Sequence, residues 1–222
     1  MKPSIAIVIP AFNEEKNIFS VVQSVMPVCA EVIVVDDCSV DDTYRKAKEA
    51  GATTLKCVVN RGQGSALRIG TKKAIENSHN VIVHFDADGQ FRVEDISKVV
   101  DPIISGRAEA VFGSRFLDNS TKMPLIKEKI IMPLARFINY IFFGIKMTDP
   151  QSGFRAFSAN VFEKIAWQQD GMAHCSEILY LVHKNRLRIE EVPITIIYHE
   201  FGQRFSGGFK IIKDLIISRF LS

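Results

Sequence analysis

Short apolar, β-branched runs alternate with helical stretches in the first half of the chain, and this alternation is the strongest constraint on the fold. Strands are predicted at residues 4–9, 31–35, 53–59, 80–83 and 108–113. Helices are predicted between them, at about residues 13–27, 44–50, 66–77 and 93–105. Because the runs are apolar along their length, both faces of each strand are expected to be covered. The pattern predicts an α/β fold, a parallel sheet wrapped by helices through right-handed crossovers.

Polar loops follow four of the predicted strands. They carry Asn13, Asp37, Asn60 and Asp88, and Asn13 is also expected to cap the first helix. The carboxyl ends of parallel strands meet at one edge of a sheet, which is where such folds bind ligands. We therefore expect these four side chains to contribute to a single site.

Two carboxylates, Asp86 and Asp88, come directly after the fourth strand and precede Gly89, which permits a tight turn. Residues two apart on an extended chain share a face, so both carboxylates can point at one ligand. Mg²⁺ or Mn²⁺ is typically held by one or two carboxylates together with substrate phosphates. The alternative interpretation of such a short pattern is a solvated acidic turn.

Composition sets the broad class. A chain of 222 residues, 47% hydrophobic and 24% charged, can form one large globular domain. Its net charge of +3 and its motifs do not indicate a nucleic-acid partner. Four cysteines without paired spacing indicate a reduced, cytoplasmic protein. Neither a signal peptide nor a transmembrane span is predicted, because the first strand starts almost at once and no apolar window reaches about 18 residues.

Two familiar nucleotide-binding motifs are absent from the sequence. The first strand is not followed by G-x-G-x-x-G, and the P-loop pattern G-x-x-x-x-G-K-[ST] does not occur. Gly62-Gln63-Gly64 lacks the third glycine and follows the third strand instead. The usual dinucleotide-binding fold is therefore not expected.

The second half contains two apolar stretches with interspersed basic residues, at 125–147 and 208–222. The first is interpreted either as a core helix or as an amphipathic helix in the membrane interface. The second predicts an amphipathic helix whose basic residues suit anionic lipid, although a helix packed on the domain would show a similar pattern.

Five motifs follow one another along the chain: Val8–Glu15 (VIPAFNEE), Val34–Thr43 (VVDDCSVDDT), Asn60–Gly64 (NRGQG), Asp86–Gln90 (DADGQ) and Asp149–Arg155 (DPQSGFR). Together they resemble the family 2 glycosyltransferases, whose fold is GT-A, a Rossmann-like, mostly parallel sheet flanked by helices. The last motif, with Gly113–Phe116 (GSRF) before it, is similar to the dolichyl-phosphate mannose synthase branch. Those relatives move a sugar from a nucleotide donor to a polyprenyl phosphate.

The resemblance implies one catalytic domain over residues 1–222. Its expected parts are a nucleotide-sugar-binding half (1–113), an acceptor-binding half (114–206) and an amphipathic C-terminal helix (207–222). The donor would be a GDP-mannose or UDP-glucose type of nucleotide sugar, and the cofactor Mg²⁺ or Mn²⁺. The enzyme is expected on the inner, cytoplasmic face of the membrane, held peripherally by its amphipathic helices.

The resemblance also implies roles for individual residues. The expected nucleotide-sugar site contains Pro10, Ala11, Asn13, Glu14, Asp36, Asp37, Ser39, Asn60, Gly62, Gly64, Asp86, Ala87, Arg204 and Lys210. The expected metal ligands are Asp86, Asp88 and Gln90, and the expected acceptor site contains Ser114, Arg115, Arg136, Ser152 and Gly153. The expected catalytic residues are Asp88, Asp149, Arg115 and Arg155. In this scheme Asp37 contacts the base, the two glycines let backbone approach the nucleotide, and the two arginines face phosphate.

The acceptor decides the mechanism. A phosphate-ester acceptor is already an anion at neutral pH, so an inverting attack needs no strong general base. A saccharide hydroxyl, the alternative acceptor, would need one, and Asp149 or Glu177 could supply it.

Three alternative functions agree less well with the sequence motifs. A processive polysaccharide synthase would carry Q-x-x-R-W, which Gln203-Arg204-Phe205 does not match. A nucleotidyltransferase would need a glycine-rich basic loop in place of residues 10–15. A non-catalytic scaffold would not need the acidic and arginine motifs.

Overall fold

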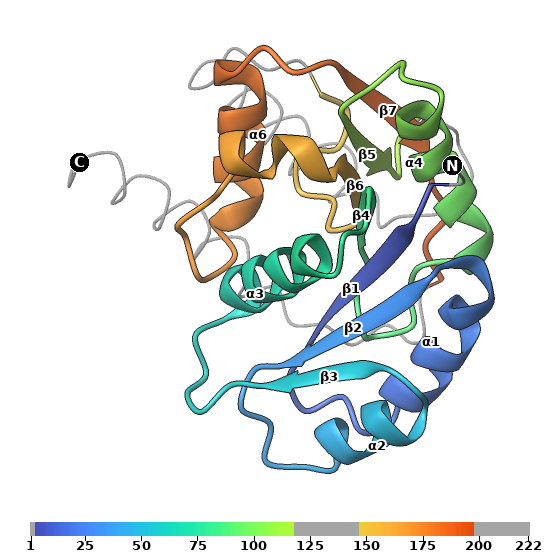
Figure 1. The fold of residues 1–222 in the computed structure, drawn as a ribbon, viewed down its shortest axis with the longest axis vertical. Coiled ribbons are helices and arrows are strands. Elements are labelled where there is room, and N and C mark those ends of the chain that lie inside the picture. Colours follow the sequence, from blue (N-terminus) through green and yellow to red (C-terminus); the bar gives the residue numbers. More distant parts are fainter. Residues whose placement is uncertain (1–2, 118–146, 198–222) are drawn as a thin grey trace.

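A computed structural model describes residues 3–117 and 147–197, and its elements confirm the expected alternation in the first half (Figure 1). The strands are β1 (Ile5–Ala11), β2 (Glu31–Asp36), β3 (Thr53–Lys56), β4 (Val81–His84), β5 (Ala110–Ser114), β6 (Arg155–Ser158) and β7 (Ile189–Pro193). The helices are α1 (Ile18–Val25), α2 (Thr43–Glu49), α3 (Gln63–Glu76), α4 (Ile96–Ile104) and α6 (His174–Lys184). Short 3-10 helices are η1 (Met26–Val28), η2 (Val93–Asp95) and η4 (Ala159–Lys164).

The seven strands form one mostly parallel sheet in the order β3-β2-β1-β4-β6-β5-β7. β1 pairs in parallel with both β2 and β4, and Ala11 lies opposite Asp36 at the carboxyl edge. The exception is β6, which lies antiparallel between β4 and β5. Neither β6 nor β7 was predicted, and β6 brings the Asp149–Arg155 motif beside β4.

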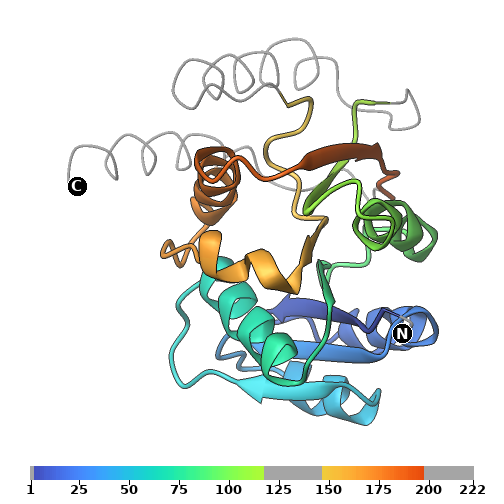
Figure 2. The same ribbon diagram turned by 45° about the horizontal axis from the view of Figure 1, so that its top comes forward.

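Helices cover both faces of the sheet (Figures 1 and 2). Along β1, Ile7 and Ile9 pack on the side of α1, α2 and α4, whereas Ala6 and Val8 pack on the side of α3, η4 and α6. This two-sided burial explains why the strand sequences are continuously apolar instead of alternating.

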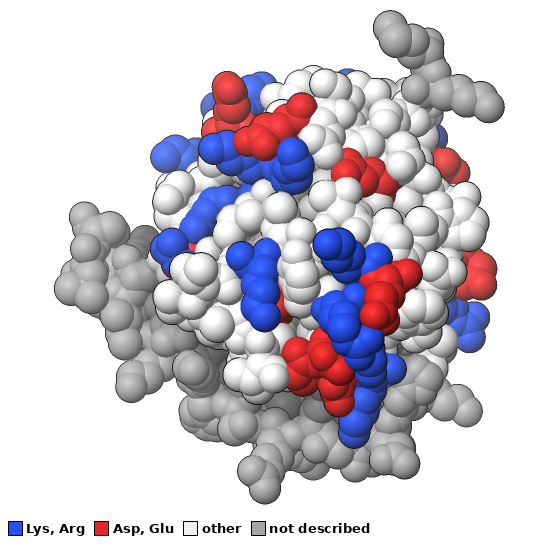
Figure 3. Space-filling model, turned by 60° about the horizontal axis from the view of Figure 1, so that its bottom comes forward, with Lys and Arg blue, Asp and Glu red and all other residues white. Residues whose placement is uncertain are grey.

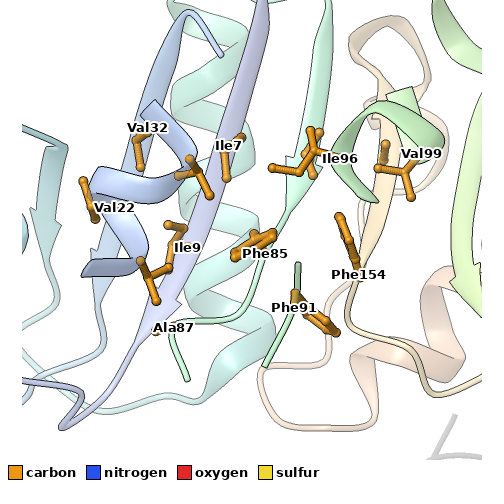
Figure 4. Close-up of a cluster of buried hydrophobic side chains, with 14 of the residues drawn as sticks. Ile7, Ile9, Val22, Val32, Phe85, Ala87, Phe91, Ile96, Val99 and Phe154 are labelled. Carbon is orange, nitrogen blue, oxygen red and sulfur yellow. The ribbon is translucent and has the colours of Figure 1, made fainter. Parts of the chain in front are cut away.

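Three aromatic rings attach the acidic turn after β4 to the core (Figure 4). The ring centroid of Phe85 lies 5.6 Å from that of Phe91 and 5.4 Å from that of Phe154, and Phe91 and Phe154 are 4.9 Å apart. Such pairs contribute roughly 0.5–1.5 kcal/mol each beyond their buried area. Because Phe85 and Phe91 flank the turn on either side, its carboxylates are held on a fixed support.

Acidic and basic side chains lie beside each other on the face that carries β3 and α2, at the bottom of Figure 1 (Figure 3). On α2, for example, Arg45 pairs with Asp42 and with Glu49, each at 2.7 Å. The charges on this face therefore largely compensate one another.

The segments on which a membrane contact was expected lie outside the described residues, except for Met147, which is buried. Within the ranges that the structure does describe, no helix combines the length and apolar character needed to cross a bilayer.

A polar network joins the amino ends of the strands. The Glu31 carboxylate accepts hydrogen bonds from Thr53 (2.6 Å), Asn77 (2.8 and 3.0 Å) and His79 (2.7 Å), and His79 also contacts the Ser4 hydroxyl. Burial by itself would raise the pKa of Glu31, but these hydrogen bonds outweigh it and lower the pKa. A lowered folded-state pKa means that the ionised carboxylate stabilises the fold.

We predict that Glu31→Gln lowers the free energy of unfolding by about 1 kcal/mol near pH 7. The stabilisation is present above the unfolded-state pKa of about 4.5 and is lost as the pH falls through the lower folded-state pKa. Urea unfolding of both proteins at about pH 7 and about pH 3 should therefore show the difference shrinking in acid. Glu76→Gln, at an exposed position, is the control; a difference that persists unchanged in acid would contradict the assignment.

Candidate active site

A cavity of about 500 Å³ opens at the carboxyl edge of the sheet, where the loops that follow β1, β2, β3 and β4 meet. The expected site residues that line it are Pro10, Ala11, Glu14, Asp37, Asn60, Gly62, Asp86, Ala87 and Asp88. The structure thus brings together residues from four separate motifs. It also adds Phe12, Gln63, Ala66 and Met172 to the cavity wall.

Asp37 organises the loop after β3 while it lines the cavity. Its Oδ1 accepts a hydrogen bond from the backbone N–H of Arg61 (3.0 Å) and its Oδ2 accepts one from Gly62 (2.6 Å). Asn60 donates from its side chain to the Asp37 carbonyl oxygen at 3.1 Å. The carboxylate therefore joins two strand-end loops into one wall.

Asp36 and Ser39 lie behind this wall and are both buried. Asp36 accepts a hydrogen bond from the Ser39 N–H (2.9 Å), and the Ser39 hydroxyl accepts one from the Asn13 N–H (2.9 Å). They shape the loop and do not line the cavity.

The first helix begins later than predicted, because residues 13–15 form a loop. Asn13 has a φ of +57°, a left-handed conformation that a helix cap does not adopt, and Asn17 occupies the cap position of α1. The Asn13 side chain accepts a hydrogen bond from the Val40 N–H, and Glu14 N–H donates to the Thr43 hydroxyl. The loop is thus fastened to the loop after β2, and this leaves Glu14 at the cavity.

Asp86 and Asp88 face the same cavity. Burial, together with the neighbouring Asp88 carboxylate, raises the pKa of Asp86 to about 7, although the Arg155 charge acts in the opposite direction. Gln63 donates to Asp86 Oδ1 at 2.8 Å, and the Gln90 N–H donates to Asp88 Oδ1 at 3.0 Å. Two carboxylates with this mutual repulsion are suited to a divalent cation.

The donor set fits Mg²⁺ or Mn²⁺ if a ligand completes it. Among residues 3–117 and 147–197, no group of three or more His, Cys, Asp or Glu side chains is placed to hold a metal. The two carboxylates supply hard oxygen ligands, and such ions are commonly completed by substrate phosphates. The geometry therefore suits a cation that binds together with a diphosphate.

The two glycines of the Asn60–Gly64 motif are required by protein packing. A Cβ on Gly62 would lie 2.7 Å from the Asp170 carbonyl oxygen, and one on Gly64 would lie 2.3 Å from that of Gln169. Gly62 also has a φ of +108°. Gly62, where the resemblance expects a nucleotide to approach the backbone, lines the cavity, whereas Gly64 is buried beneath residues 169–170 and does not line it.

Arg115, expected at the acceptor, lies against Asp149. Arg115 donates to both carboxylate oxygens, at 2.5 and 2.7 Å, and Asp149 is fully buried. Ser114 contacts the Thr148 hydroxyl, and Glu191 of β7 accepts hydrogen bonds from the N–H groups of Thr148 and Asp149. The pair therefore belongs to a network beside the cavity, and Asp149 does not line it.

Arg155 takes a different position from the one expected of a phosphate ligand. It is 1% exposed, and it donates to the Gly153 carbonyl oxygen (3.4 Å) and to Cys175 Sγ (3.0 Å). Period-two alternation in β6 directs it under the sheet toward α6. Gly153 itself packs on Asp86, since a Cβ there would meet Asp86 Oδ2 at 2.9 Å.

Glu177 and Ser152 complete the expected set within the described residues. Glu177 accepts hydrogen bonds from the N–H groups of Gln168 and Gln169, and Ser152 is buried. Arg136, Arg204 and Lys210 lie outside the described residues.

Gln63 and Met172 are the residues that sequence reasoning missed most clearly. Gln63 lies between the two glycines at the start of α3, so its place in a strand-end motif was a usable signal. Met172 follows β6 by a long stretch of sequence and belongs to no motif, so only the folded chain reveals it.

We predict that Gly64→Ala destabilises the protein by about 2 kcal/mol or more, because the added methyl group meets backbone that cannot move freely. Gly171→Ala is the matched control, since a Cβ there meets nothing within 4 Å. Thermal or urea unfolding of the two variants gives the comparison. Equal stabilities would show that the segment over Gly64 yields easily.

Known proteins that resemble this chain in sequence include glycosyltransferases. Residues 6–166 match glycosyl transferase family 2. The UDP-N-acetylglucosamine–dolichyl-phosphate N-acetylglucosaminyltransferase of Methanococcus voltae is 37% identical over 239 residues, which cover 96% of this chain and 95% of that protein. The polyprenol monophosphomannose synthase of Mycolicibacterium smegmatis is 29% identical over 91% of this chain and 81% of its own length.

The fold has a similar counterpart among solved structures. Glucosyl-3-phosphoglycerate synthase from Mycobacterium tuberculosis, in a complex with Mn²⁺, UDP and glucosyl-3-phosphoglycerate, superposes with a TM-score of 0.72 at 22% identity. The match covers 97% of this chain and 80% of that one. The fold and the family match agree with the resemblance seen in the motifs, and the chain belongs to the family 2 glycosyltransferases, with a GT-A fold.

Proposed function

We propose that this glycosyltransferase moves a single hexose from a nucleoside diphosphate sugar, of the GDP-mannose or UDP-glucose type, to a polyprenyl phosphate. The observation that carries the proposal is the cavity at the carboxyl edge, where Asp37, Asn60 and the Asp86–Asp88 pair line one space. The names of the Methanococcus and Mycolicibacterium relatives, with dolichyl phosphate and polyprenol as acceptors, support the acceptor class.

Asp86 and Asp88 would hold Mg²⁺ or Mn²⁺, with Gln90 as the expected third protein ligand. The solved structure with a similar fold contains Mn²⁺ and UDP, which supports this cofactor. When bound, the ion would supply Lewis-acid stabilisation of the diphosphate leaving group. Gln63 orients Asp86, and the Gln90 backbone orients Asp88, through the hydrogen bonds described above.

The state of the candidate bases favours an anionic acceptor. Arg115 contacts both oxygens of Asp149, Glu177 accepts backbone hydrogen bonds from residues 168 and 169, and neither carboxylate lines the cavity. A saccharide hydroxyl would need a base near the reacting carbon, whereas a phosphate ester is ionised already. Inversion follows from attack opposite the leaving diphosphate.

The cellular location follows from the acceptor. A polyprenyl phosphate is anchored in a membrane while nucleotide sugars are water-soluble, so we place the enzyme peripherally on the cytoplasmic face. The expected contacts are the basic apolar stretches at 125–147 and 208–222.

The first test is a transfer assay. We predict that the full chain with Mg²⁺ or Mn²⁺ releases UDP or GDP from one of UDP-glucose, UDP-N-acetylglucosamine and GDP-mannose when a short-chain polyprenyl phosphate is added. The matched polyprenol without phosphate should give no product. Turnover only with a saccharide acceptor would overturn the proposed acceptor and would favour transfer to a hydroxyl group. The same conclusion would follow if Asp149→Asn or Glu177→Gln lost nearly all turnover while donor binding was retained.

The second test concerns the carboxylate pair. We predict that Asp88→Ala weakens metal-dependent donor binding by about 100-fold or more, since removing a group that merely supports a metal ligand already costs about 10–100-fold. Asp101→Ala, an exposed acidic residue on α4, is the control. Titration calorimetry with and without Mn²⁺ measures the effect, and unchanged affinity in Asp88→Ala would refute the metal assignment.

A further inference from the structure

A segment of the second half, Trp167–Met172, packs onto the start of α3. The buried Trp167 indole donates to the Gly64 carbonyl oxygen at 2.8 Å, and the Ser65 N–H donates to the Asp170 carbonyl oxygen at 3.1 Å. The close approach of this segment to Gly62 and Gly64 leaves no room for a side chain at either position. Its far end, Met172, lines the cavity.

Asp170 fastens the segment by two arginines. Its Oδ2 accepts hydrogen bonds from Arg61 at 3.0 and 2.7 Å, and its Oδ1 accepts one from Arg68 at 2.6 Å. Arg68 also donates to the carbonyl oxygens of Trp167 and Gln168, both at 3.2 Å. Partial burial would raise the pKa of Asp170, but Arg68 and Arg61 outweigh it and lower the pKa, so the carboxylate is charged at neutral pH.

These contacts hold the loop before α3 from two sides. On one side the Asp37 carboxylate accepts hydrogen bonds from the backbone N–H groups of Arg61 and Gly62. On the other side the Asp170 carboxylate binds the Arg61 guanidinium. The residue that follows Gly62 is Gln63, whose side-chain amide donates a hydrogen bond to Asp86 Oδ1 at 2.8 Å. A short series of contacts therefore leads from Asp170 to a carboxylate of the donor cavity.

The contribution of Asp170 to global stability should be small. The Arg61 side chain is 59% exposed, and partly exposed ion pairs typically contribute little to the free energy of unfolding. We therefore expect the two ion pairs of Asp170, with Arg61 and Arg68, to act mainly by fixing the position of the chain beside the cavity.

We propose that Asp170 is a positioning residue of the donor site, which locks the Trp167–Met172 segment onto the start of α3 and thereby holds Gln63 against Asp86. The identity of the ligand, a nucleoside diphosphate, rests on the proposed function, whereas the contacts of Asp170 do not depend on it. The cost of disturbing such support is typically about tenfold or more in affinity.

The ligand-free test is amide hydrogen exchange of the full chain. Asp170→Asn is expected to speed exchange in peptides covering residues 61–66, while its urea unfolding stays close to that of the wild type and shows that the fold is intact. Glu190→Gln is the matched control, because Glu190 also binds a distant arginine, Arg107, but at the amino end of β7. Unchanged exchange in Asp170→Asn would overturn the proposal.

The ligand test is a double-mutant cycle with Mg²⁺ and UDP or GDP, followed by calorimetry. Asp170→Asn alone should weaken binding of the nucleotide by roughly tenfold, and much less in a Gln63→Ala background, because the effect passes through Gln63. Equal losses in both backgrounds would overturn the proposal. If the wild type binds neither nucleotide, the proposed function fails, while the exchange result still decides the role of Asp170.

Discussion

Parallel pairing of β1 with β2 on one side and β4 on the other is the constraint on which the site depends. Its register places Ala11 opposite Asp36, so β1 and β2 finish at one level, while β4 finishes three residues earlier, with His84 opposite Val8. Loops that are far apart in sequence then open at one edge. A slip of one residue would exchange the residues that pack on the two faces of the sheet, and the close packing of both apolar clusters opposes it.

That edge concentrates negative charge, and the fold stabilises each carboxylate differently. Asp37 receives two backbone N–H donors, Asp36 receives one from Ser39, and Asp86 receives the amide of Gln63. Charge-assisted hydrogen bonds of this kind offset much of the desolvation cost. Burial and the neighbouring Asp88 carboxylate raise the pKa of Asp86 to about 7, and the pKa of Glu14, which lines the same cavity, is raised as well, chiefly by burial. Electrostatic repulsion among these carboxylates therefore lies where a cation and a diphosphate are expected.

Local patterns were enough to predict the first half of the fold. Continuous apolar runs identify β1, β2 and β4, and polar residues directly after them identify the edge where the cavity opens. The same reasoning could not find β6, since four residues with an arginine among them do not form an apolar run and their strand pairing is antiparallel. It also could not orient Arg155, because a sequence shows a charge but not the face of an unpredicted strand. The misplaced first-helix start has a similar cause, since the left-handed Asn13 depends on contacts with a loop 26 or more residues away.

The cavity at the carboxyl edge is consequently built by both halves of the chain. Gly153 packs against Asp86, Met172 contributes to the wall, and Asp170 binds two arginines beside the Asn60–Gly64 motif. Gly62 lies between the cavity on one side and the backbone of residues 170–171 on the other, whereas Gly64 is buried against residues 169–170. A division into a donor half and an acceptor half describes where the motifs lie in the sequence. In the folded molecule, the residues that follow β6 form part of the cavity wall, so both halves of the chain contribute to the surroundings of the same two carboxylates.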